Sequence, residues 1–123
     1  STGSGISKFD IKKVIIKGNN IEREFEKEID QWKMTNDDIL FNSQDIDLLL
    51  QFVLEQDAIS IGIGTYPKEK EIAKVILFGY DLKPLDTIRI ALSDDEKLMI
   101  ENGDNVLRLH DDTFKIKIQS LIK

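Results

Sequence analysis

The chain has 123 residues, of which 41% are hydrophobic and 33% charged, and its formal net charge at pH 7 is −6. This length and composition are typical of a single globular domain that buries its own core. The acidic balance argues against binding to a nucleic-acid backbone, and no apolar run approaches the roughly 20 residues of a membrane-spanning helix.

The first residues, Ser1 to Gly5, have the composition of a linker or cloning remnant. We therefore predict a single domain over residues 6–123. Its first element is a strand over Phe9–Lys17, which is apolar and rich in β-branched residues. Gly18-Asn19-Asn20 then predicts a turn, because Gly and Asn tolerate positive φ.

The segment Ile21–Met34 carries two competing patterns. Its apolar residues recur at helical spacing, and its glutamates favour a helix. Against this, a helix would place like charges at i, i+4 three times, at a cost of about 0.2–0.5 kcal/mol for each pair. In a strand, by contrast, alternate positions are all acidic and would share one face: Glu22, Glu24, Glu26, Glu28 and Asp30. The charge pattern favours a strand that forms a hairpin with Phe9–Lys17.

An amphipathic helix is predicted over residues 44–56. Asn42 or Ser43 can cap its N-terminus, and acidic residues in its first turn suit the helix dipole. The apolar face follows the i, i+3, i+4, i+7 spacing and comprises Ile46, Leu49, Leu50 and Val53.

The remainder of the chain predicts a β-rich second half with one helical turn at Lys68–Glu71. The expected strands are 58–63, 72–80, 87–92, 97–101, 106–110 and 114–119. The last of these rests on the alternation of Phe114, Ile116 and Ile118 with polar residues. The whole order predicts an α+β fold, a mainly antiparallel sheet of about seven to eight short strands with one well-defined helix.

No motif predicts catalysis, a cofactor or a metal site. The absence of cysteine excludes disulfides and thiolate chemistry, and it fits a cytoplasmic location. His110 is the only histidine, and no nucleophile is placed with it by spacing. Gly62-Ile63-Gly64 lacks the third glycine and the following helix of a dinucleotide fingerprint, so a bulge is the simpler interpretation.

The acidity is concentrated between Ile21 and Asp57, where eleven acids face three bases for a net charge of −8. Such a local field attracts cationic partners. We therefore hypothesise a non-enzymatic, acidic protein-binding domain, concretely an immunity or inhibitor-type protein that masks a basic surface of a toxin or nuclease. The partner-binding residues of this hypothesis are Glu22, Glu24, Glu26, Glu28, Asp30, Trp32, Asp37 and Asp38. Phe41 and Tyr66 are further candidate aromatic anchors.

Two alternatives remain open at the level of sequence. One is a structural or oligomerising module of a larger assembly, of the phage or secretion type, with exposed strand edges within residues 72–119 as its contact surface. The other is a small-ligand-binding domain with a pocket near Gly62–Tyr66. The sequence specifies neither the partner nor the oligomeric state.

Overall fold

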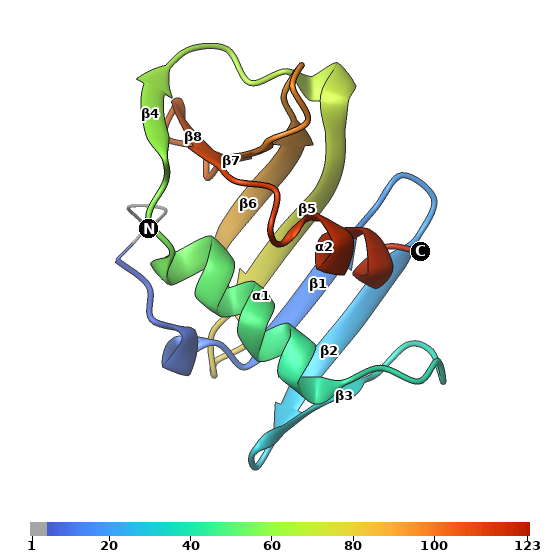
Figure 1. Cartoon of the computed structure of the whole chain (residues 1–123). Helices are drawn as coiled ribbons and strands as arrows, with labels where there is room; N and C mark the ends of the chain where they lie inside the picture. Colours follow the sequence, from blue (N-terminus) through green and yellow to red (C-terminus); the bar gives the residue numbers. More distant parts are fainter. Residues whose placement is uncertain (1–4) are drawn as a thin grey trace.

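The computed structural model describes residues 5–123, so Ser1–Ser4 of the predicted linker remnant lie outside the described residues. One antiparallel sheet of eight strands carries two helices, which lie together on one of its faces (Figure 1). This confirms the predicted α+β class. The strands are β1 (Lys13–Lys17), β2 (Glu22–Glu28), β3 (Gln31–Met34), β4 (Ser60–Ile63), β5 (Glu71–Phe78), β6 (Pro84–Leu92), β7 (Leu98–Glu101) and β8 (Val106–His110). Their order across the sheet is β3-β2-β1-β5-β6-β7-β8-β4.

The long helix α1 (Ser43–Glu55) lies where the apolar periodicity predicts it. Asn42 is its N-cap, and the side-chain oxygen of Asn42 accepts a hydrogen bond of 3.0 Å from the backbone N–H of Gln44. The predicted apolar face packs against the sheet, and two further residues, Phe52 and Leu54, join it. Burial of this face supplies most of the stability of a helix of this length.

The acidic segment after the first turn forms strands rather than a helix. β2 pairs with β1 in the predicted hairpin, with Val14 opposite Phe25. Arg23 and Phe25 point into the core, whereas the glutamates of β2 lie on the opposite, outer face. The alternation of charge therefore reports a real alternation of faces.

Residues 114–119 do not form the predicted strand. Phe114 is the N-cap of a second helix, α2 (Lys115–Leu121), in which Ile118 and Leu121 are buried and Ile116 is 76% exposed. The two buried residues have the i, i+3 spacing of a helix face. A turn precedes the helix, in which the backbone N–H of Lys115 donates a hydrogen bond to the carbonyl oxygen of Asp112. Phe9 also lies outside β1, in the short 3-10 helix η1 (Lys8–Asp10), and a second one, η2 (Lys68–Lys70), precedes β5. Within residues 5–123 no helix has the length and apolarity that crossing a bilayer requires.

The turn between β2 and β3 contains an unusual backbone conformation. Ile29 and Asp30 form a two-residue hairpin loop, and Ile29 has a φ of 57° while its side chain is 93% exposed. A two-residue loop with positive φ at its first position favours glycine there. A β-branched residue in this conformation is rare and strained.

Replacing Ile29 with glycine should therefore raise the free energy of unfolding by about 1 kcal/mol. The exposed side chain contributes little burial to offset this gain. Urea denaturation of the wild type and the variant measures the difference. Ile29→Val is the matched control, because valine keeps the β-branch and should give no gain. Equal stability of all three proteins would contradict strain at this turn.

Candidate functional site

The outer face of β2 carries four of the predicted partner-binding acids, and a lysine lies beside each of them. The side-chain distances between ammonium and carboxylate are 3.5 Å for Lys17–Glu22, 3.9 Å for Lys13–Glu24, 3.9 Å for Lys12–Glu26 and 2.8 Å for Lys33–Glu28. The hydrogen bond and charge of Lys33 lower the pKa of Glu28, and Glu28 in turn raises the pKa of Lys33. We name this arrangement the charge ladder.

The charge ladder changes how the acidic outer face of β2 is interpreted. Three of its lysines precede β2 in the chain, and the fourth, Lys33, comes from β3. Four positive charges thus stand against four negative ones on the same face. Exposed ion pairs of this kind contribute little stability each. Their effect here is to cancel most of the field that the glutamates alone would project.

Trp32 lies in the core, where its side chain is only 2% exposed. Its indole N–H donates a hydrogen bond of 3.0 Å to the carboxylate of Asp47 on α1. Its backbone N–H donates one of 2.8 Å to the hydroxyl of Ser43. In this position Trp32 joins β3 to the start of α1 and offers no surface for a partner. Phe41 is half-buried and lies edge-on to Phe25 at a ring-centroid distance of 5.0 Å.

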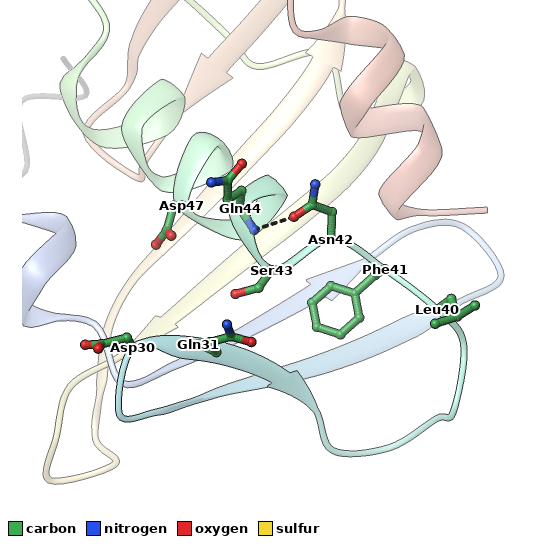
Figure 2. A pocket seen from close by; sticks show the side chains of 8 residues that line it. All are labelled: Asp30, Gln31, Leu40, Phe41, Asn42, Ser43, Gln44 and Asp47. Carbon is green, nitrogen blue, oxygen red and sulfur yellow. Dashed lines mark hydrogen bonds between the residues drawn. The ribbon is translucent and has the colours of Figure 1, made fainter.

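An open hollow of about 800 Å³ lies between the start of β3 and the N-terminus of α1 (Figure 2). Asp30 and Gln31 from the hairpin form one wall, and the segment leading into α1 forms the other. Figure 2 shows Leu40 at one end of this hollow and Asp30 at the other. The residues that line it are Asp30, Gln31, Leu40, Phe41, Asn42, Ser43, Gln44 and Asp47.

Three acids differ from those of the charge ladder: Asp30, which lines this hollow, and Asp37 and Asp38, which precede its lining residue Leu40 in the chain. Asp30, Asp37 and Asp38 are exposed, and within residues 5–123 no basic side chain lies within ion-pair distance of their carboxylates. Asp37 and Asp38 occupy the loop that leads to Leu40, whose side chain is 98% exposed. We call Asp30, Asp37 and Asp38 the acidic rim and Leu40 its apolar neighbour. A negative rim beside an exposed apolar side chain has the composition of a protein contact surface.

The other sequence-level candidates lie apart from this hollow. Gly62 is exposed on β4, and Tyr66 is buried against the outer face of the sheet, with the guanidinium of Arg89 5.7 Å from its ring centre. Burial and the neighbouring Glu71 raise the pKa of the Tyr66 hydroxyl, so Tyr66 stays neutral. His110 is buried against Phe52. No cluster of three or more metal-ligating side chains occurs in the described part of the chain.

Comparisons of the chain with family models, with characterised proteins and with solved structures gave no significant match. Of the predicted partner-binding residues, Asp30, Asp37 and Asp38 are exposed and have no ion-pair partner in the part of the chain that the structure describes. Sequence reasoning missed the exposure of Leu40, although an apolar run placed directly after two aspartates was a visible signal of it.

Proposed function

We propose that the protein is a non-enzymatic binding module whose acidic rim contacts a basic protein. The observation that carries this proposal is the contrast between two groups of acids. Those of the charge ladder are neutralised within the chain, whereas those of the rim have no cation in ion-pair range among the described residues. Leaving such carboxylates exposed keeps them available to a partner's lysine or arginine side chains.

The rim and its surroundings combine two kinds of contact. The carboxylates of Asp37 and Asp38 favour encounter with a cationic surface, and Leu40 supplies an apolar contact that excludes water from it. The strained and exposed Ile29 adjoins Asp30 in the hairpin turn. Strain of this kind often accompanies function, which supports a role for the Asp30 end of the hollow. An inhibitor of the immunity type, which masks the basic surface of a toxin or nuclease, would use this chemistry.

The test compares charge reversal at the rim with charge reversal elsewhere. Asp37→Lys with Asp38→Lys should abolish capture of the partner from a lysate of the source organism at low salt. With the purified partner, the same variant should slow association about tenfold or more. Leu40→Ser should instead speed dissociation, because it removes an apolar contact.

A matched control makes the same change of charge far from the rim. Glu55→Lys with Glu69→Lys replaces two exposed acids that lie in no ion pair of the described residues. This control should bind as the wild type does. Equal loss of binding in both double variants would reduce the effect to net charge, and equal retention in both would remove the rim from the interface. Thermal unfolding of each variant confirms that the comparison is made between folded proteins.

A further inference from the structure

The two edge strands of the sheet, β3 and β4, differ in how they are protected from pairing with another chain. At one margin, the backbone N–H of Trp32 in β3 is already bonded to the hydroxyl of Ser43, and the charged Lys33 projects beside it. Lysines and covering segments are the usual means by which a sheet edge avoids pairing with another chain. The β3 margin is therefore closed to strand addition.

At the other edge, β4 has none of these protections among residues 5–123. In the described chain β4 pairs only with β8, so one side of its backbone has no strand partner (Figure 1). Residues 58–66 contain no charged residue, and the first proline follows at position 67. A short strand that is uncharged, rich in isoleucine and without proline readily pairs with another strand.

Three exposed isoleucines lie along this edge of the sheet. Ile61 and Ile63 are 67% and 90% exposed, and Ile59, just before the strand, is 60% exposed. Ile61 lies opposite Arg108, which in turn lies opposite the core residue Ile100. The isoleucines of β4 therefore lie on the same face of the sheet as the helices, but beyond the area that the helices cover. Ser60 and Gly62 take the other face, where they add little bulk.

We propose that β4 pairs antiparallel with β4 of a second copy of this chain, so that two sheets join edge to edge. The strand is complementary to itself: with Ile61 opposite its own copy on the two-fold axis, Ile59 lies opposite Ile63 and every isoleucine meets another. No like charges meet within residues 58–66, because that segment has no charge. An isologous contact of this kind uses β4 of both copies, and the protected β3 margins stop growth at the dimer.

This contact is independent of the acidic rim, which lies beside β3 and the start of α1. A pair of four-residue strands buries less area than a standard stable interface, so the dimer should be weak and depend on concentration. Sedimentation equilibrium from micromolar to millimolar concentration should show the mean mass rising from 14.1 kDa towards twice that value. A monomer at every concentration would overturn the proposal, as would species larger than a dimer.

Ile61→Glu tests the location of the contact. Within one chain the new carboxylate faces Arg108, so the fold should tolerate it, whereas two carboxylates would meet across the two-fold axis. The variant should stay at 14.1 kDa over the whole range. Ile116→Glu, on α2, is the matched control and should dimerise as the wild type does. A dimer that survives Ile61→Glu would place the contact elsewhere and overturn the proposal.

Because the chain has no cysteine, a single introduced thiol gives a second readout. Ile61→Cys should form a disulfide-linked dimer under mild oxidation, since residues facing each other across an antiparallel pair lie close enough to bridge. Ile116→Cys should stay largely monomeric under the same conditions. Equal rates of crosslinking at the two positions would also overturn the proposed register.

Discussion

Replacing Arg23 with methionine should lower the free energy of unfolding by roughly 2–4 kcal/mol, because it removes two charge-assisted hydrogen bonds from a buried site. Arg23 points inward from β2, and its guanidinium donates to the carbonyl oxygen of Leu121 at 2.8 Å and to that of Lys123. Leu121 is the last residue of α2, where a helix leaves carbonyl oxygens unsatisfied, and Lys123 lies two residues beyond it. Arg23 is thus a buried polar attachment of the end of α2 to the sheet, in addition to the ion pairs that α2 forms through Lys115 with Glu96 and through Lys117 with Asp45.

The methionine variant separates this attachment from simple packing. Methionine keeps an apolar chain of similar length, so the loss reports the guanidinium itself. Hydrogen exchange should show that the amides of α2 lose protection more than those of α1. Arg23→Lys should restore little, because one ammonium cannot donate to both carbonyls with the geometry of a planar fork.

Lys27→Met is the matched control on the same strand and the same face. The ammonium of Lys27 lies 5.9 Å from the ring centre of Trp32, a cation–π contact worth about 0.5–1 kcal/mol. Urea denaturation of both variants gives the comparison. If Arg23→Met cost no more than Lys27→Met, Arg23 would not be what holds α2.

The sequence contains enough information to predict the segments whose pattern is local. In the acidic strand, helical like-charge pairs and strand alternation make opposite predictions, and the structure follows the charge pattern. In α1, the apolar face and the Asn42 cap agree, and the helix begins one residue before the predicted start. In both cases the deciding interactions lie within about four residues of each other in the chain.

Where the deciding interactions come from residues distant in the chain, local sequence patterns do not predict the structure. The alternation of Ile116 and Ile118 resembles a strand, yet this segment is a helix held by Arg23, which lies almost a hundred residues earlier. The glutamates of β2 form an acidic run in the sequence, but the strand register sets lysines of β1 beside them. The predicted acidic site therefore shrinks to the rim, and only the tertiary structure makes this visible.

The strand order also places the free edge of the sheet elsewhere than the sequence predicts. Every strand within residues 72–119 has a neighbour on both sides, so the exposed edges expected there do not exist. The unprotected margin is β4, from the segment in which glycines and isoleucines alternate. Gly62 lies in β4 and Gly64 follows it, and β4 pairs with β8 without a register shift, so the bulge expected at these glycines is wrong for the described chain.

Acidification should destabilise the fold through His110, the single histidine of the chain. Its ring is 1% exposed and packs 5.1 Å from that of Phe52, which in turn stacks on Phe114 at 4.9 Å. Neither ring nitrogen has a hydrogen-bond partner in the described chain. Burial lowers the pKa of His110 below its ordinary value of 6.5, because the imidazolium would lose its hydration there.

The direction of the pH dependence follows from this lowered pKa. Above pH 6.5 the imidazole is neutral in both the folded and the unfolded chain, and His110 adds no pH dependence. As the pH falls below that value, the unfolded chain takes up a proton that the folded chain does not. The free energy of unfolding then decreases, by at most about 1.4 kcal/mol for each pH unit, until the pH reaches the lowered pKa of the folded state.

Comparison with His110→Leu isolates this contribution, because all carboxylates are common to both proteins and their effects cancel in the difference. At pH 7.5 the variant should be at least as stable as the wild type, since leucine leaves no buried nitrogen unpaired. At pH 5.5 its advantage should be larger, and urea denaturation at the two pH values measures the change. Parallel stability profiles for the two proteins would mean that His110 binds its proton equally well in the folded and unfolded states, against the burial seen here.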